Sequence, residues 1–193
     1  MSEVKNIMIV GVGGQGSLLA SRIIGNAVLL KGFDVKVSEV HGMSQRGGSV
    51  VTYVRYGDEV WSPVICRGEA DIILSFELLE AARWLPYLKK DGVIVVNTQE
   101  INPMPVITGA MTYPDNIVEK IRAKGVKVVA ADTLKLAREA GNEKSSNVAL
   151  IGLMGKYLSF DTDTLRESVK MSVPPKFLDI NLKAFELGYN YEN

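Results

Sequence analysis

Short apolar runs alternate with amphipathic segments along most of the chain. The run at 7–10 is continuous rather than alternating, as is 93–96, and similar short runs at 70–75 and 126–130 each contain one charged residue. Such runs are typical of parallel strands that are buried on both faces. Between them, apolar residues recur every three or four positions, which predicts helices at 19–28, at 78–88 with a kink near Pro86, at 114–124, and after the capping residue Asp132 through Ala140.

The first part of this pattern predicts a Rossmann-like βαβ unit, formed by 7–10, the helix at 19–28 and a second strand at 35–40. The next segment breaks the alternation. Residues 50–56 have strand periodicity, Gly57-Asp58 is typical of a hairpin turn, and 59–61 is expected to start a return strand that Pro63 stops. The sequence therefore predicts an antiparallel β-hairpin inserted into a mainly parallel sheet.

From Ser145 onward the pattern predicts only helices, at 147–160, 163–171 and 176–187, with Gly188 as the cap of the last. The chain contains no linker, repeat or low-complexity tract. Together these elements predict one domain over residues 1–193. Its expected fold class is α/β, three-layered, with a mainly parallel sheet and a helical C-terminal tail.

Composition narrows the functional classes. Lys plus Arg and Asp plus Glu number 22 each, so the net charge is zero, which argues against nucleic acid or an anionic membrane as a partner. One cysteine and one histidine exclude an internal disulfide, an iron–sulfur cluster and a multi-histidine metal site. No apolar run approaches the roughly 18 residues of a membrane span, and the first residues lack a signal peptide. We therefore expect a cytoplasmic protein.

The first candidate site is the glycine turn Gly11-Val12-Gly13-Gly14-Gln15-Gly16, which follows a predicted strand and precedes a predicted helix. Glycines at 11, 13 and 16 fit G-x-G-x-x-G, a pattern that lets a pyrophosphate approach the backbone and the helix N-terminus. Glu39, near the end of the second strand, is placed to bind a ribose. The alternative is a close strand–helix turn that binds no ligand.

The second candidate is the loop His41-Gly42-Met43-Ser44-Gln45-Arg46-Gly47-Gly48, which is polar and rich in glycine. It follows the second strand at the carboxyl edge, where open α/β sheets bind ligands. Arg46 can hold a phosphate or carboxylate, His41 can titrate near neutral pH, and Met43 can contact a partner. The alternative is a solvated loop in which a backbone carbonyl satisfies His41.

These two segments resemble the gamma-type domain of the 2-oxoacid:ferredoxin oxidoreductases, and in particular the beta subunit of the indolepyruvate enzymes. The string from His41 to Gly48 is the most specific part of the resemblance. Ser146-Asn147-Val148-Ala149-Leu150 and the ending Asn181-Leu182-Lys183-Ala184-Phe185-Glu186-Leu187-Gly188-Tyr189 are similar to that family too. The resemblance therefore runs nearly from end to end.

The resemblance implies a role as one subunit of a hetero-oligomer. Enzymes of this family oxidatively decarboxylate a 2-oxoacid, form an acyl-CoA and reduce ferredoxin. Thiamine diphosphate and the [4Fe–4S] clusters are expected on the large partner chain, through which ferredoxin would be reached. Coenzyme A is the candidate ligand of the glycine turn. No catalytic residue, metal or tightly bound cofactor is expected on this chain, which should be inactive alone.

Two other functions remain open. One is a free-standing NAD(P)-binding oxidoreductase of Rossmann type that uses Glu39 at the ribose, and the other is a purely structural subunit. The remaining conspicuous residues have structural interpretations. Cys66 is expected as a small apolar residue in or near a strand, and Asp161 and Asp163 as helix caps. Trp61 and Trp84 are expected as core or interface anchors.

Overall fold

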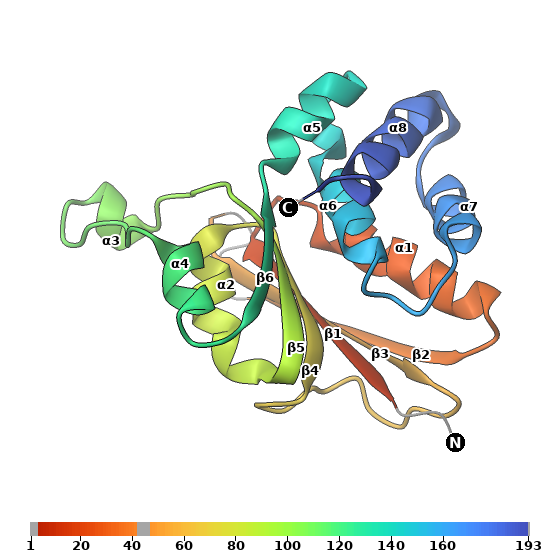
Figure 1. Ribbon diagram of the computed structural model, residues 1–193, viewed down its shortest axis with the longest axis horizontal. Coiled ribbons are helices and arrows are strands. Elements are labelled where there is room, and N and C mark those ends of the chain that lie inside the picture. Colours follow the sequence, from red (N-terminus) through yellow and green to blue (C-terminus); the bar gives the residue numbers. More distant parts are fainter. Residues whose placement is uncertain (1–3, 42–46, 193) are drawn as a thin grey trace.

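A computed structural model of the chain describes residues 4–41 and 47–192. It contains a six-stranded sheet in the order β2-β3-β1-β4-β5-β6 (Figure 1). Only β3 runs opposite to the other five strands. The strands are β1 (Lys5–Val12), β2 (Asp34–His41), β3 (Ser49–Gly57), β4 (Ala70–Ser75), β5 (Leu88–Asn97) and β6 (Lys127–Ala131). The predicted class, a mainly parallel α/β sheet, is confirmed.

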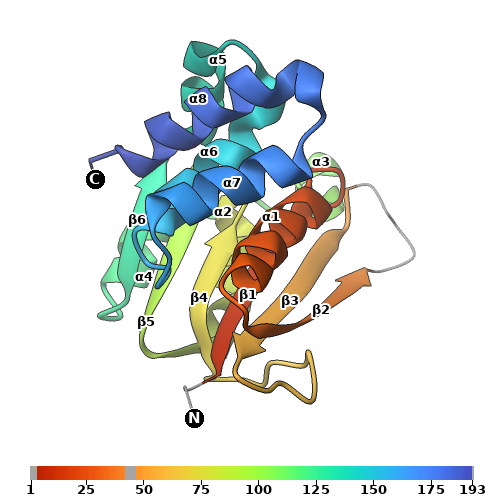
Figure 2. The same ribbon diagram turned by 90° about the vertical axis from the view of Figure 1, so that its right-hand side faces the viewer.

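Helices cover both faces of the sheet, which makes three layers (Figures 1 and 2). One layer holds α1 (Ser17–Leu30), α5 (Thr133–Ala140), α6 (Ser146–Gly155), α7 (Thr162–Ser172) and α8 (Leu178–Tyr189). The other holds α2 (Leu78–Trp84) and α4 (Ile117–Arg122), while α3 (Met104–Ile107) projects to the side. Short 3-10 turns occupy Leu85–Tyr87, Glu143–Ser145 and Pro175–Phe177. Within the described residues, none of these helices has the length and apolar character needed to cross a bilayer.

The continuous apolar runs divide between two cores. Ile7 and Ile9 of β1 face the layer with α1 and α6, whereas Met8 and Val10 face the layer with α2 and α4. All four side chains are at most 1% exposed. Successive residues of a strand point to opposite faces, so a strand covered on both sides needs apolar residues at every position.

The expected βαβ unit and hairpin are arranged differently from the prediction. β3 lies between β1 and β2 and pairs antiparallel with both, so β1 and β2 are parallel but not neighbours. The predicted return strand at 59–61 does not form. Both edges of β3 are already paired, which leaves no edge for that segment. A side chain holds it instead: Asp34 Oδ2 accepts from the backbone nitrogen of Val60 at 2.9 Å. Arg55 Nη1 holds the residues that follow by donating to the carbonyl oxygens of Ser62 and Val64 at 2.9 and 3.0 Å.

Several smaller predictions change as well. β5 begins at Leu88 rather than at Val93, and α3 has no counterpart in the sequence pattern. Cys66 is exposed and lies outside the strands, in the segment that leads into β4. Trp61 is 86% exposed and does not anchor the core. Trp84, the last residue of α2, is partly buried and packs against the core between α2 and the sheet. The capping roles of Asp132 and Asp161 are confirmed, since each accepts a hydrogen bond from the backbone nitrogen three residues on. Asp163 is not a cap, because it lies in the first turn of α7, where it pairs with Arg166.

A close crossing of α6 and α8 anchors the helical layer. Every residue from Asn147 to Gly155 is buried, so α6 is enclosed on all sides. Gly188 lies inside α8, and a Cβ there would overlap the carbonyl oxygen of Ala149 on α6. Its predicted role as a helix cap was therefore wrong. The residue is glycine because the two backbones meet at that point.

This crossing generates a stability prediction. Gly188→Ala should lower the free energy of unfolding by about 1–3 kcal/mol, because the new methyl forces the two helices apart. Gly25→Ala in α1 is the matched control, since nothing lies within 4 Å of a Cβ at that position. The control should raise stability by about 1 kcal/mol through helix propensity. Denaturant unfolding of both variants is the measurement, and equal effects would contradict the packing role of Gly188.

Candidate functional site

The glycine turn joins β1 to α1 and needs glycine for two different reasons. Gly14 and Gly16 have φ of +102° and +90°, in the left-handed region that favours glycine. Gly11 and Gly16 also allow close packing. A Cβ on Gly11 would lie 3.0 Å from Cβ of Phe76, and one on Gly16 would lie 2.6 Å from Nδ2 of Asn147. The turn is thus held tightly against β4 and α6.

Gln15 locks the turn from inside. Its Oε1 accepts a hydrogen bond from the backbone nitrogen of Val12 at 2.7 Å. Its Nε2 donates to the carbonyl oxygen of Phe76 at 3.0 Å and to Oε1 of Gln99 at 3.2 Å. The oxygen and the nitrogen of the side-chain amide are therefore both engaged in hydrogen bonds within the protein. Gln15, which the sequence places among the ligand-binding residues, therefore shapes the turn.

A cavity of about 460 Å³ lies beside the turn. The structure brings most of the described candidate residues together here, with lining from Gly13, Gly14, Gly16, Ser17, Leu18, Glu39, His41 and Val50. Glu39 is half-buried, and its Oε2 accepts from Ser17 Oγ at 3.4 Å and Thr52 Oγ1 at 3.3 Å. The N-cap of α1 is Gly16, which has no side chain to satisfy the first helical N–H groups. The cavity therefore offers backbone donors at the positive end of a helix of 14 residues.

A second cavity, of about 360 Å³, lies on the other side of the turn. It is lined by Gly14, Gln15 and Gly16 together with Asn97, Lys144 and Asn147. Asn97 ends β5, and its Oδ1 accepts from the backbone nitrogen of Thr133 at 3.1 Å. This is the carboxyl edge of the parallel strands, where α/β sheets bind ligands. The candidate residues from the sequence did not include Asn97, although a polar residue directly after the run 93–96 is a usable signal.

The loop after β2 is tied to the turn at its far end. The backbone nitrogen of Gly13 donates to the carbonyl oxygen of Gly48 at 2.9 Å. Gly47 has a φ of +75°, and His41 is exposed at the end of β2. The candidates Met43, Ser44, Gln45 and Arg46 lie outside the described residues, as does Gly42. The described ends of the loop therefore meet the glycine turn and the first cavity.

A buried carboxylate that the sequence gave no reason to select anchors the start of β3. Glu80 on α2 is 4% exposed, and it accepts hydrogen bonds from Ser49 Oγ, from Trp84 Nε1 at 3.2 Å and from Arg83 Nε at 3.0 Å. Ser49 directly follows Gly48. Because removing one partner of a buried hydrogen-bonded charge is costly, Glu80 fixes where the loop rejoins the sheet. The sequence did not reveal this role because a glutamate on an amphipathic helix is normally expected on the face exposed to solvent.

Glu77, one turn earlier, fixes the segment on the other side. It is 1% exposed and caps α2 by accepting from the backbone nitrogen of Glu80 at 2.8 Å. Its other oxygen accepts from the backbone nitrogen of Ile101 at 3.1 Å and from the hydroxyl of Tyr113. Burial and the Glu77 carboxylate raise the pKa of Tyr113 far above its usual range, so its hydroxyl stays a donor.

The glycine turn offers groups that can bind a ligand. Backbone N–H groups, two glycines with positive φ and polar side chains, the carboxylate of Glu39 among them, surround the first cavity. Across the described residues, no group of three or more His, Cys, Asp and Glu side chains is arranged to hold a metal ion. The arrangement thus supports recognition of a phosphate-bearing group at the turn.

Comparison with known proteins gives matches over almost the whole chain. The family model for pyruvate ferredoxin/flavodoxin oxidoreductase matches residues 6–191. The chain is 48% identical to the indolepyruvate oxidoreductase subunit IorB of Pyrococcus horikoshii and 47% identical to that of Thermococcus kodakarensis. Both alignments cover 95% of this chain and 93% of the relative.

Solved structures show the same fold. The gamma subunit of a keto/oxoacid ferredoxin oxidoreductase from Geobacter sulfurreducens superposes with a TM-score of 0.71 at 23% identity, covering 96% of both chains. A 2-oxoglutarate:ferredoxin oxidoreductase from Magnetococcus marinus, solved with 2-oxoglutarate, coenzyme A and succinyl-CoA bound, gives a TM-score of 0.73 at 21% identity. That match covers 98% of this chain and 31% of the larger one. The resemblance inferred from the sequence is confirmed: the chain belongs to the pyruvate ferredoxin/flavodoxin oxidoreductase family.

Proposed function

We propose that this chain is the small subunit of an indolepyruvate-type 2-oxoacid:ferredoxin oxidoreductase. The complex would decarboxylate an aryl 2-oxoacid oxidatively, form the acyl-CoA and pass electrons to ferredoxin. The observation that carries this proposal is the match, over nearly the full length of both chains, to subunits named for indolepyruvate oxidoreductase. Thiamine diphosphate and the [4Fe–4S] clusters are assigned to a large partner chain, because one cysteine is too few to hold a cluster here.

The role proposed for this chain is to bind coenzyme A at the glycine turn. Phosphate groups of the ligand would accept hydrogen bonds from the first N–H groups of α1, at Ser17 and Leu18, which line the first cavity. Nothing lies within 4 Å of a Cβ position at Gly14, so a ligand can approach the backbone closely. The half-buried carboxylate of Glu39 would accept hydrogen bonds from ribose hydroxyls.

The loop from His41 to Gly48 is proposed to face the active site on the large subunit. Two described contacts support a defined position for its end: Gly13 to Gly48, and Ser49 to Glu80. Arg46 would supply the charge that meets an anionic group of coenzyme A or of the partner. In this arrangement Glu80 and Gln15 are positioning residues that act through the loop and the turn.

Strand order favours this assignment over a nicotinamide-binding domain. In dinucleotide-binding folds the strand that carries the ribose-binding acid is the direct neighbour of the first strand. Here β3 separates β2 from β1. Glu39 also accepts from Thr52 on that intervening strand at 3.3 Å. Titration with NADH in the second test below distinguishes the two assignments.

The redox content of the chain gives the first test. The isolated chain should be colourless and should not reduce a viologen dye with any 2-oxoacid. Co-expressed with its large subunit, it should yield a brown complex that reduces the dye with indolepyruvate in the presence of coenzyme A. Absorbance spectra, iron and sulfide assays and dye reduction are the measurements. Stoichiometric iron or dye reduction in the isolated chain would refute this division of labour.

The glycine turn gives the second test. Gly13 does not have positive φ, so Gly13→Ala should be tolerated by the backbone. It should weaken coenzyme A binding to the complex about tenfold or more by blocking the approach of a phosphate. Gly14→Ala is the stability control, because its φ of +102° makes alanine strained, at about 1 kcal/mol or more. Calorimetric titration of coenzyme A and of NADH, beside thermal melting, separates the two effects.

Either of two results would contradict the coenzyme A assignment. Unchanged coenzyme A affinity in Gly13→Ala would remove the turn from the site and favour a purely structural subunit. Micromolar NADH binding to the isolated wild-type chain, lost in Gly13→Ala, would favour the dehydrogenase function instead.

The loop gives the third test. Arg46→Ala should lower turnover of the reconstituted complex about tenfold or more, because loss of a charge-assisted contact costs about 1.5–3 kcal/mol. Melting of the isolated chain should change little, as is usual for a loop substitution. Lys120→Ala on α4 is the control, since this side chain is 61% exposed and pairs with the surface residue Asp115. Steady-state rates at varied coenzyme A are the measurement, and equal turnover of both variants would remove Arg46 from the site.

A further inference from the structure

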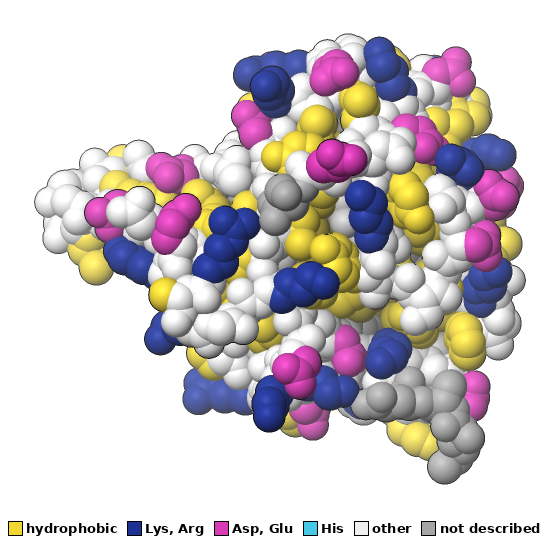
Figure 3. Space-filling view, viewed as in Figure 1, with side chains coloured by type: hydrophobic (Ala, Val, Ile, Leu, Met, Phe, Trp, Pro, Cys, Tyr) yellow, Lys and Arg dark blue, Asp and Glu magenta, His cyan; other side chains and the backbone are white. Residues whose placement is uncertain are grey.

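An arm projects from the carboxyl edge of the sheet, the edge at which the glycine turn also lies. The arm consists of residues 101–114, between the end of β5 and the start of α4, and it contains α3. Figures 1 and 3 show this segment projecting to one side of the molecule. Three of its side chains, Met104, Ile107 and Met111, are 66%, 65% and 65% exposed. Large apolar side chains that gather on one exposed segment mark an interaction surface.

The arm carries no charge. Residues 101–114 contain no Asp, Glu, Lys, Arg or His, in a chain in which 23% of the residues are charged. The centres of protein interfaces are depleted of charged residues and enriched in methionine. Met104 and Ile107 are three residues apart on α3 and therefore share one face of it. The composition and spacing of the arm are thus those of a segment that is buried against another protein.

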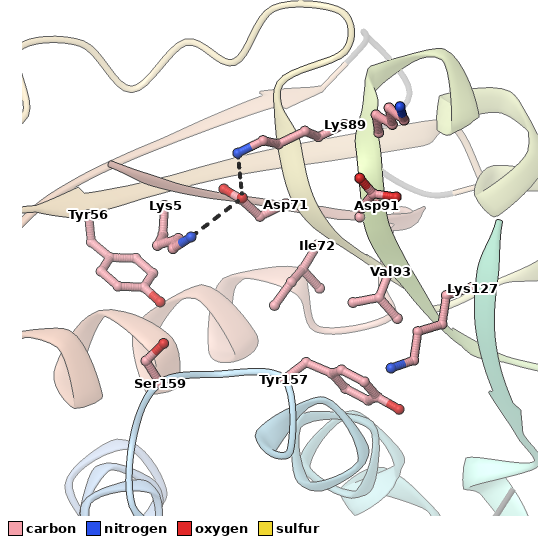
Figure 4. Close-up of a pocket in the computed structure, with 12 residues that line it drawn as sticks. Lys5, Tyr56, Asp71, Ile72, Lys89, Asp91, Val93, Lys127, Tyr157 and Ser159 are labelled. Atoms are coloured by element: carbon pink, nitrogen blue, oxygen red, sulfur yellow. Dashed lines mark hydrogen bonds and ion pairs between the residues drawn. The ribbon is translucent and has the colours of Figure 1, made fainter. Parts of the chain in front are cut away.

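The opposite, amino edge of the sheet has the reverse character. Figure 4 shows Asp71 between two lysines, with its Oδ1 3.8 Å from Nζ of Lys5 and 3.3 Å from Nζ of Lys89. Lys90 and Asp91 line the same cavity. A protein that packed on that edge would have to remove these charges from water, which is costly. Of the two ends of the sheet, the carboxyl edge with its uncharged arm is therefore the better surface for burial.

The tip of the arm is held in shape by its own hydrogen bonds. Thr108 Oγ1 donates to the carbonyl oxygen of Met104 at 3.0 Å, and the backbone nitrogen of Met111 donates to the carbonyl oxygen of Pro105 at 3.0 Å. The rings of Pro103 and Pro105 fix two further backbone torsions. A segment whose shape is already fixed loses less conformational entropy when it binds.

Polar side chains fix the two ends of the arm beside the candidate site. The carboxylate of Glu77, 1% exposed, accepts from the backbone nitrogen of Ile101 at 3.1 Å and from the hydroxyl of Tyr113. Gln99, just before the arm, accepts at its Oε1 from Nε2 of Gln15 in the glycine turn at 3.2 Å. A protein that faces the glycine turn therefore meets the arm as well.

We propose that this arm docks into an apolar, uncharged groove on the large partner subunit, with Met104, Ile107 and Met111 as its anchors. The proposal rests on the function proposed above, which puts the large subunit at the glycine turn. The arm would fix the orientation of the two subunits, because its ends are bonded to the same α2 and glycine turn that shape the candidate site.

Two other occupants fit the arm less well. Three side chains cover much less than the ~800 Å² per partner that a stable dimer buries, so pairing with a second copy through the arm alone is disfavoured. The larger contact of a hetero-oligomer supplies the remaining area. A lipid surface is disfavoured because the residues that flank the arm, Glu100 and Asp115, are acidic, whereas segments that bind membranes are rich in lysine and arginine.

The stability of the co-expressed complex tests the proposal. Ile107→Glu should raise the dissociation constant of the complex about tenfold or more, because a charge replaces an apolar anchor. Ile107→Leu, which keeps the side chain apolar, should associate like the wild type. Met171→Glu on α7 is the matched control, since Met171 is also an apolar helical residue, 56% exposed, in the other helical layer. Mass photometry over a dilution series gives the dissociation constants, and thermal melting of the isolated chains should be unchanged.

The possible failures are distinguishable. A wild-type chain that forms no complex with the large subunit would overturn the proposed function and the docking arm together. A complex that forms equally well with wild type and Ile107→Glu would overturn the docking arm alone, as would equal losses in Ile107→Glu and Met171→Glu.

The isolated chain should be monomeric in light scattering and should not sediment with phosphatidylcholine vesicles. A dimer that Ile107→Glu converts to a monomer would assign the arm to a second copy and contradict the proposal. Vesicle binding that the same substitution abolishes would contradict it in favour of a lipid surface.

Discussion

The candidate site depends on the pairing of β3 with both β1 and β2. Register places Ser49 opposite Val12 and Val50 opposite Gly11, so the end of the loop after β2 arrives directly at the glycine turn. The same strand pairs Val50 with His41 on its other side. A shift of one residue in this register would turn every side chain of β3 to the wrong face. The antiparallel strand inside a parallel sheet thus determines which two segments can form one site.

Buried polar side chains hold this arrangement in place. Glu80 and Glu77 from α2 secure the loop and the segment after β5, and Gln15 locks the turn against Phe76 and Gln99. Within the described part of the chain, no buried side-chain nitrogen or oxygen lacks a hydrogen-bond partner. Satisfied networks of this kind rigidify the backbone around them, whereas one missing partner would leave a costly buried charge. The shape of the candidate site is therefore set by residues that need not touch a ligand.

The two ends of the sheet have different chemistry. At the carboxyl edge, the first N–H groups of α1, whose N-cap Gly16 has no side chain, lie beside the Glu39 carboxylate and the glycine turn. At the amino edge, lysines gather around apolar side chains and tyrosines. The helical layer, fixed by the contact of Gly188 with Ala149, covers the sheet between them. Of these two ends, only the carboxyl edge corresponds to the motif in the sequence.

Much of the molecule could be predicted from the sequence by itself, because the signals are local. Continuous apolar runs identified the core of the buried strands, Asp132 and Asp161 marked helix starts, and the motif between His41 and Gly48 indicated the family. Only the tertiary structure decided where β3 pairs, why Gly188 is glycine, and that Glu80 is buried. One cavity at the amino edge is lined by Lys5, Lys89, Lys90 and Lys127, which meet only through strand order. Periodicity reports which face of an element is apolar, but the partner that covers that face is chosen by contacts between residues far apart in the chain.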